Sequence, residues 1–88
     1  MTTEDEKKYA KHLLGKTVVT KTGKKFGEVG NITFETRTGE LIQILLKNPT
    51  SYTEGLELEK DSDGSLMIPY SAVIAIGDFV VVSEEDII

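Results

Sequence analysis

The fold is decided by the stretch FGEVGNITFETRTGELIQILLK, residues 26–47. Its first part alternates: Phe26, Ile32 and Phe34 fall on one face of an extended strand, and mostly polar residues fall on the other. Such a period of two is typical of a strand with one buried face. Arg37-Thr38-Gly39 predicts a turn, after which the chain returns. The stretch therefore predicts a β-hairpin with one face in the core.

Two glycines, Gly27 and Gly30, interrupt the first strand of this hairpin. Glycine inside a strand is costly unless the strand bends or another backbone approaches it closely. In a chain of 88 residues, this indicates a coiled strand that turns the corner of a small barrel.

The returning segment, residues 40–47, is apolar on both faces. One face consists of Ile42, Ile44 and Leu46. The other face consists of Leu41, Gln43 and Leu45, and these are the candidate interface residues. A strand that is apolar on both sides needs a cover on both sides. Either a second subunit covers the outer face, or the chain's own N-terminal segment or C-terminal tail does.

Short strands and turns are predicted along the rest of the chain. The expected strands are Thr17–Thr20, Leu56–Glu59, Ser65–Ile68, Val73–Ile76 and Phe79–Val82, with a loop over residues 48–55 and a 3₁₀ turn over Pro69–Ala72. The spacing of Thr3 and Glu6 matches a capping box and predicts a short helix over about residues 4–13. The predicted fold class is all-β: a small curved barrel of about six short strands with a short N-terminal helical segment.

Composition places the chain among globular proteins, with 39% hydrophobic and 28% charged residues. No cysteine is present, and no apolar run approaches the ~20 residues that span a bilayer, so we expect a cytoplasmic protein. The net charge of −5 is uneven: residues 1–25 carry seven lysines against three acids, and residues 48–88 carry one lysine against nine acids. This asymmetry either solvates two different faces or orients the chain against another copy or a basic partner.

Catalytic and metal-binding chemistry finds little support. His12 is the single histidine and has no partner set beside it by sequence. Asp61-Ser62-Asp63-Gly64 lacks the glycine and glutamate positions of a calcium loop, so a β-turn explains it. The lysines near the N-terminus have few aromatic residues among them, which argues against a platform for stacking nucleic-acid bases. We therefore predict no enzyme, no catalytic residues, no metal and no cofactor.

The order and spacing of several short motifs resemble the PRC-barrel domain family. The motifs are Leu14–Val18, Gly23, Phe26–Val29, Thr38-Gly39, Ile68–Tyr70, Val73, Ile76–Asp78 and Val80–Val82. The resemblance implies structural roles for Gly15, Gly23, Gly27, Gly39, Pro69, Tyr70, Gly77 and Asp78. It divides the chain into a helical leader (residues 1–13), the barrel domain (14–83) and an acidic tail (84–88).

By length, the chain is most similar to the stand-alone archaeal members of this family. The resemblance implies a non-enzymatic protein–protein interaction module, expected to be a homodimeric adaptor that docks on another cytoplasmic protein. Some such members act in archaeal cell division beside SepF and FtsZ. The alternative is an RNA or ribosome-assembly accessory factor of the 16S rRNA maturation type. The acidic net charge makes nucleic acid the less favoured partner.

Overall fold

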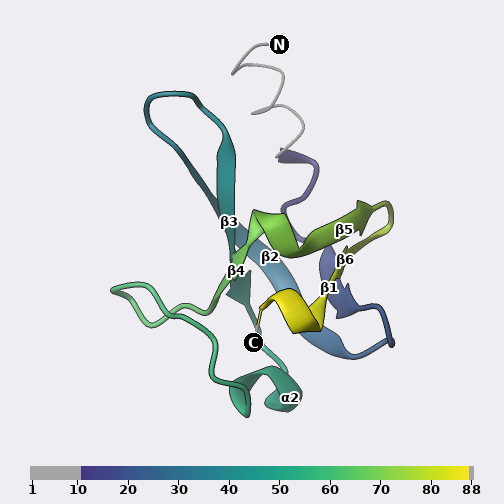
Figure 1. Cartoon of the computed structure of the whole chain (residues 1–88). Coiled ribbons are helices and arrows are strands. Elements are labelled where there is room, and N and C mark those ends of the chain that lie inside the picture. Colours follow the sequence, from purple (N-terminus) through teal and green to yellow (C-terminus); the bar gives the residue numbers. More distant parts are fainter. Residues whose placement is uncertain (1–10, 88) are drawn as a thin grey trace.

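The computed structural model describes residues 11–87, and six β-strands form one sheet in this part of the chain (Figure 1). The strands are β1 (Thr17–Thr20), β2 (Lys25–Phe34), β3 (Leu41–Lys47), β4 (Met67–Pro69), β5 (Val73–Ile76) and β6 (Phe79–Val82). Their order across the sheet is β4-β3-β2-β1-β6-β5. All neighbouring strands are antiparallel except β1 and β6, which run parallel. The predicted all-β class with about six short strands is confirmed.

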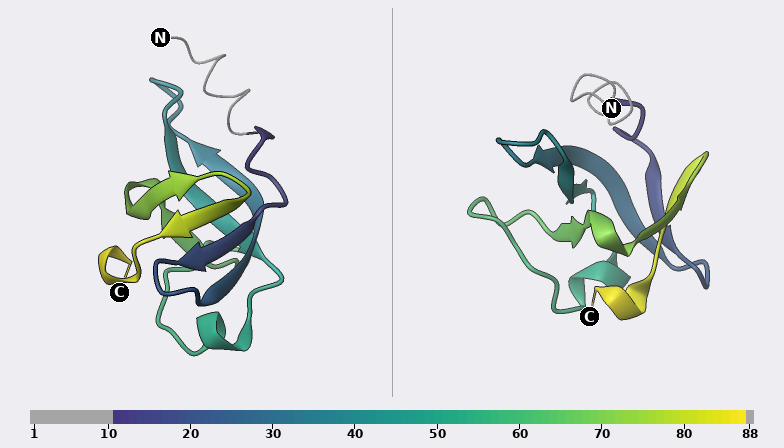
Figure 2. Two further views of the ribbon diagram at one scale, coloured as in Figure 1. Left: turned by 90° about the vertical axis from the view of Figure 1, so that its right-hand side faces the viewer. Right: turned by 45° about the horizontal axis from the view of Figure 1, so that its top comes forward.

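The sheet curls around its core, but its ladder of hydrogen bonds does not close (Figure 2). Its two edges, β4 and β5, are consecutive in the chain and are joined by the 3₁₀ helix η1 (Tyr70–Ala72). Pro69 has no N–H to donate to a ladder, and the N–H of Val73 donates to the carbonyl of Tyr70 at the end of η1. The chain therefore crosses between the edges through a turn. The closed barrel predicted from the sequence is corrected to a curled, open sheet.

One apolar cluster fills the inside of the curled sheet. It consists of Leu13, Val18, Phe26, Val29, Ile44, Leu46, Leu58, Leu66, Ile68, Ala72, Val80 and Val82. Cross-strand pairs build it: Val18 lies opposite Val80, and Ile44 lies opposite Ile68. Leu13, assigned by the sequence to the leader, is fully buried in this cluster. Residues 1–10 of the predicted helical leader lie outside the described residues.

Two glycines of β2 allow the end of β3 and the following loop to approach closely. Gly27 has φ +148°, and a Cβ there would lie 3.1 Å from the carbonyl oxygen of Lys47 and 3.1 Å from Cα of Pro49. A Cβ on Gly30 would lie 2.8 Å from Cβ of Lys47. The pairing of β2 with β3 is irregular around Gly30, as expected for a bulge. The sequence predicted either a bend or a close backbone approach at these glycines; Gly27 shows the backbone approach, and Gly30 lies at the bulge with the Lys47 side chain against it.

A second irregularity in the β2–β3 pairing changes which side chains of β3 face the core. Thr33 pairs with Gln43, but the next residue of β2, Phe34, pairs with Leu41, so that Ile42 is an extra residue. One extra residue reverses the facing of everything beyond it. Leu41 therefore packs against the core, and Ile42 is 41% exposed. The strict alternation predicted for this strand is therefore broken near its start, at Ile42.

A short helix, α2 (Ser51–Glu54), lies where the sequence predicted a loop. The Thr50 hydroxyl caps it by accepting a hydrogen bond from the Thr53 N–H, as is typical of a helix start. Thr53 is fully buried, and its hydroxyl donates to the carbonyl of Phe26 at 2.6 Å. The helix is thus attached to β2 by polar contacts that no periodicity in the sequence reveals.

Two other segments differ in part from their predicted structure. Residues 56–59 form no strand, and the only pairing nearby is an isolated bridge between Lys60 and Leu66. An extended segment can bury alternate side chains, such as Leu58, without pairing with another strand. The alternation of apolar and charged residues over 56–59 therefore predicted a strand that does not form. The acidic tail contains a 3₁₀ helix, η2 (Glu84–Asp86), after which Ile87 packs against the core. The predicted 3₁₀ turn at Pro69–Ala72 is confirmed by η1.

Candidate interaction surfaces

The outer face of β3 is the surface that the sequence singled out. Gln43 and Leu45 lie there and are half-buried, and Leu45 has Asn31 on one side and Met67 on the other as its cross-strand neighbours. Leu41, the third predicted residue, packs against the core because of the bulge in β3. The structure therefore brings two of the three candidate residues together on the outer face.

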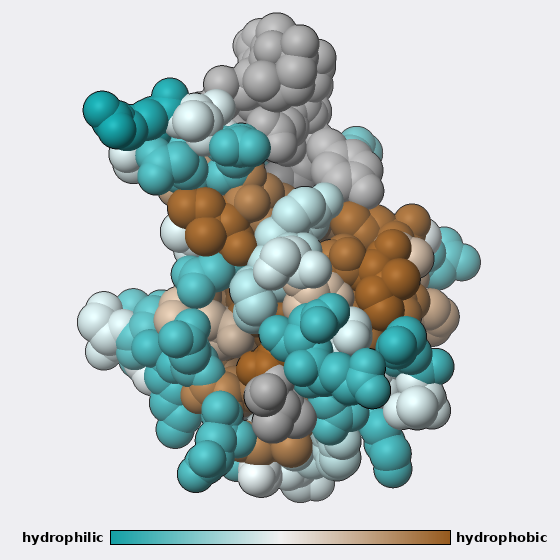
Figure 3. Space-filling model, viewed as in Figure 1, coloured by the Kyte–Doolittle hydropathy of each residue, from teal (hydrophilic) through white to brown (hydrophobic). Residues whose placement is uncertain are grey.

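A hollow of about 560 Å³ lies between the tip of the β2–β3 hairpin and η1. Its lining consists of Glu35, Glu40, Leu41, Ile42, Pro69, Tyr70 and Ser71. In Figure 3, brown apolar surface lies beside the β2–β3 hairpin, next to teal residues. The hollow combines apolar walls with two carboxylates, and its lining contains no lysine or arginine.

A second apolar surface lies at the other edge of the sheet, on the β5–β6 hairpin. Ile74 is 51% exposed and Phe79 is 52% exposed. Brown surface covers this region on the right of Figure 3. The signal for it in the sequence is the run Phe79–Val82, which is apolar on both faces of β6, although only Val80 and Val82 are fully buried. Sequence reasoning gave this run only the role of a strand.

Most residues implied by the family resemblance occupy turns and strand ends, and Gly27 lies inside β2. Positive φ angles occur at Gly15 (84°), Gly23 (92°), Gly27 (148°) and Gly39 (77°). Pro69 ends β4, Tyr70 begins η1, and Gly77 and Asp78 form the tip of the β5–β6 hairpin. Lys16 Nζ donates to the Gly77 carbonyl at 2.7 Å and ties this tip to the start of β1. These positions are consistent with the structural roles that the resemblance implies.

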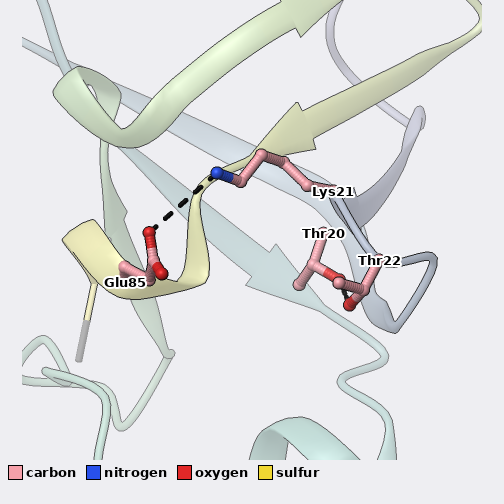
Figure 4. A network of polar contacts seen from close by, with 4 residues as sticks. All are labelled: Thr20, Lys21, Thr22 and Glu85. Atoms are coloured by element: carbon pink, nitrogen blue, oxygen red, sulfur yellow. Dashed lines mark hydrogen bonds and ion pairs between the residues drawn. The ribbon is translucent and has the colours of Figure 1, made fainter.

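Polar side chains link the first turn to the C-terminal 3₁₀ helix (Figure 4). Lys21 Nζ lies 3.9 Å from Glu85 Oε1, and the hydroxyls of Thr20 and Thr22 lie 3.0 Å apart. Both partners of the ion pair are well exposed, at 56% and 87%, so solvent screens their attraction. This contact orients the C-terminal segment but adds little to stability.

A stronger link joins α2 to the same C-terminal segment. The Tyr52 hydroxyl donates a hydrogen bond to Glu84 Oε2, and Lys24 Nζ lies 5.5 Å from the centre of the Tyr52 ring. The hydrogen bond to Glu84 raises the pKa of Tyr52 above its ordinary value of 10.0, and burial and the Glu84 charge act in the same direction. A phenol held in this way is a structural donor at neutral pH.

The described residues offer little for metal or acid–base chemistry. Among residues 11–87, no three histidine, cysteine, aspartate or glutamate side chains are grouped so that they could hold a metal ion. His12 is exposed. Asp61 Oδ1 accepts the N–H groups of Asp63 at 3.0 Å and Ser65 at 2.9 Å, which is the geometry of an Asx turn. Within the same residues, no helix has the length and apolar character needed to cross a bilayer.

Comparison with known families assigns the fold. The family model described as "PRC-barrel domain" matches residues 5–86. The chain belongs to this family. The sequence-based prediction of a PRC-barrel domain is therefore confirmed. The matched residues include the outer face of β3, the β5–β6 hairpin, the hollow beside η1 and the C-terminal 3₁₀ helix.

A relative of this PRC-barrel chain is found in an archaeon. The "Uncharacterized protein MJ1118" of Methanocaldococcus jannaschii is 28% identical over 82 residues, which cover 93% of this chain and 88% of the relative. The similarity thus extends over nearly the whole of both chains. It is consistent with the archaeal type of PRC-barrel predicted from the sequence.

Proposed function

We propose that this PRC-barrel chain is a non-enzymatic interaction module that forms homodimers and docks on another protein. The observation that carries the proposal is the exposure of large apolar side chains on β3 and on the β5–β6 hairpin. Ile42, Ile74 and Phe79 are 41%, 51% and 52% exposed in a chain with a small core. Apolar surface of this kind is commonly used to bind partners.

Two surfaces are available for self-association. The outer face of β3 has the candidate residues Gln43 and Leu45, and the β5–β6 edge has Ile74 and Phe79. A twofold dimer places the same patch of both copies in contact, so one charge introduced into the patch appears twice in the interface. We propose the outer face of β3 as the interface and treat the β5–β6 edge as its competitor.

Sedimentation velocity of three variants tests the interface. Leu45→Glu is expected to give a folded monomer where the wild-type chain is a dimer, because two buried carboxylates would face each other. Ser62→Glu, which adds the same charge at an exposed turn residue, should remain a dimer. If Leu45→Glu stays a dimer and Phe79→Glu is a monomer, the interface lies at the β5–β6 edge and the assignment to β3 is wrong. A monomeric wild-type chain at high concentration would refute self-association.

The family resemblance directs the search for the second partner toward the archaeal division machinery. We propose SepF as the first protein to test, because it is the anchor of the FtsZ ring. Titration calorimetry of the chain with purified SepF measures the interaction directly. Absence of heat with SepF and with FtsZ would remove cell division from the proposal and would leave the dimer measurement unaffected.

RNA binding is the alternative function, and the exposed lysines of the β1–β2 turn favour it. Two of them are engaged, since Lys21 pairs with Glu85 and Lys24 lies over the Tyr52 ring. The net charge of −5 opposes binding to a phosphate backbone. We expect no binding to ribosomal RNA that weakens steeply with salt, and a steep salt dependence in a filter-binding assay would support the alternative.

A further inference from the structure

The hollow between the β2–β3 hairpin and η1 is built by two features, the extra residue in β3 and the end of β4 at Pro69. The extra residue in β3 turns Ile42 outward, where it lines the hollow and is 41% exposed. Pro69 ends β4 at the other wall, because proline cannot continue a ladder of hydrogen bonds. Among the described residues, no strand pairs with β4 on its far side.

Two glutamates, Glu35 and Glu40, lie opposite each other at the rim of this hollow. The N–H of Glu35 donates to the carbonyl of Glu40 at 2.7 Å, so the two residues are neighbours across the hairpin. Like charges placed opposite each other in a hairpin are destabilising. Within residues 11–87 neither carboxylate forms an ion pair. A cation held between them would relieve their repulsion.

Local hydrogen bonds orient both carboxylates. Glu35 Oε1 accepts the N–H of Arg37 at 2.7 Å, and Glu40 Oε1 accepts the hydroxyl of Thr38 at 3.1 Å. Each carboxylate has a second oxygen for which no bond is seen within the described residues. The rim thus presents two partly oriented acceptors beside the apolar side chains of Leu41, Ile42 and Tyr70.

We propose that this hollow binds an exposed segment of a partner protein in which a large apolar side chain is flanked by lysine or arginine. The apolar side chain would lie against Ile42 and Tyr70, and the cations would lie at Glu35 and Glu40. An apolar wall beside two glutamates, in a lining without lysine or arginine, selects this partner by charge complementarity. The inference rests on the proposed function, because it names the kind of protein on which the module docks.

NMR titration of the ¹⁵N-labelled chain with the synthetic peptide acetyl-Lys-Lys-Leu-Phe-Lys-Lys-amide tests the proposal. We expect the largest shift changes at Glu35, Glu40, Ile42 and Ser71. The matched peptide with glutamates in place of the four lysines should leave these signals in place. Equal shifts with both peptides, or no shift at the hollow up to millimolar peptide, would overturn the proposal.

Variants of the rim separate specific binding from general attraction to an acidic chain. Glu35→Gln combined with Glu40→Gln should weaken the lysine peptide about 5- to 20-fold, from two partly exposed charge pairs. The control pair Glu57→Gln and Glu59→Gln removes the same charge from exposed residues outside the hollow and should bind as the wild type does. If both double variants lose the same amount of peptide affinity, the peptide is attracted by the overall negative charge and not by the hollow, which would contradict the proposal.

A second copy of the chain is the competing occupant. If the same signals move when the chain alone is concentrated, the hollow is a self-interface and the assignment to a partner is wrong. Gln43 and Leu45 do not line the hollow, so the sedimentation result for Leu45→Glu is independent of the peptide result. The proposal for the hollow and the proposal for the dimer are therefore tested by separate results.

Discussion

Gly27 shows how a single residue sets the shape of the sheet. Its φ of +148° suits glycine, and the space where a side chain would begin is occupied by the backbone of Lys47, Asn48 and Pro49. Strand β2 can therefore lie against the loop that follows β3. The same residue lies next to Phe26, which is fully buried and whose carbonyl accepts the Thr53 hydroxyl.

Gly27→Ala is expected to destabilise the fold by about 2 kcal/mol, because it adds backbone strain at a positive φ and tight contacts with the backbone of Lys47, Asn48 and Pro49. Urea unfolding followed by circular dichroism measures the change. Gly77→Ala is the control, since a Cβ at Gly77 would meet nothing within 4 Å. The control should lie within about 0.5 kcal/mol of the wild type. An equally small loss of stability in both variants would show that the loop after β3 shifts to accommodate the new side chain and that Gly27 is not required.

At the scale of elements, short pieces are held by side-chain hydrogen bonds to strands. Helix α2 has four residues, which is far below the length at which an isolated helix is stable. Thr50 donates its hydroxyl hydrogen bond to the Lys25 carbonyl at 2.6 Å, and Thr53 does the same to Phe26. The start of β2 serves as the template for this helix.

Thr53→Val should cost about 0.5–1.5 kcal/mol, because it keeps the shape of the side chain and removes one of two donors to the Phe26 carbonyl, the other being the Thr50 N–H at 3.0 Å. Hydrogen exchange measured by NMR should show the loss first in residues 51–55. Ser51→Ala, a change of an exposed residue in the same helix, is the control and should stay within about 0.5 kcal/mol. A Thr53→Val variant as stable as the wild type would mean that another donor replaces the hydroxyl.

At the scale of the whole molecule, contacts distant in sequence fasten the C-terminal segment to the body. Tyr52 and Glu84 are 32 residues apart, and the N–H of Ser83 donates to the Ala72 carbonyl at 2.8 Å. Ile87 adds an apolar contact with the core. The acidic tail expected from the sequence is thus, up to Ile87, a packed part of the described structure.

The hydrogen bond between Tyr52 and Glu84 predicts a pH dependence of stability. The folded chain holds the Tyr52 proton above the ordinary pKa of 10.0, so the unfolded chain loses its proton first as the pH rises. The contribution of this bond is fully present below about pH 10 and disappears as the pH rises through the folded pKa. Urea unfolding of the wild type and Tyr52→Phe between about pH 8 and pH 12 should show a steeper alkaline loss for the wild type.

Glu84→Gln supplies the control, because it removes the carboxylate that accepts the hydrogen bond. Ultraviolet titration of the phenols should show one tyrosine that ionises late in the wild type and earlier in Glu84→Gln. Identical titration curves would contradict the hydrogen bond. Lys21→Ala, which removes only the exposed ion pair with Glu85, should leave the curve nearly unchanged.

Much of the fold was predictable because it depends on local patterns. The alternation from Phe26 to Phe34, the turn at Gly39 and the apolar run Phe79–Val82 identify strands and turns from residues that are neighbours in the chain. The candidate site was predicted only in part. Gln43 and Leu45 follow from a period of two, but Leu41 does not, because the bulge depends on how β2 pairs with it.

Local alternation and glycine placement are encoded residue by residue, and they were sufficient for the all-β class, whereas the PRC-barrel family followed from the resemblance of several short motifs. Which strand edges meet depends on contacts between distant residues, such as the parallel pairing of Thr17–Thr20 with Phe79–Val82. The same applies to the open ladder at Pro69, the outward turn of Ile42 and the hollow between them. A side chain's facing depends on its strand's register with a partner, and only the folded chain sets that register.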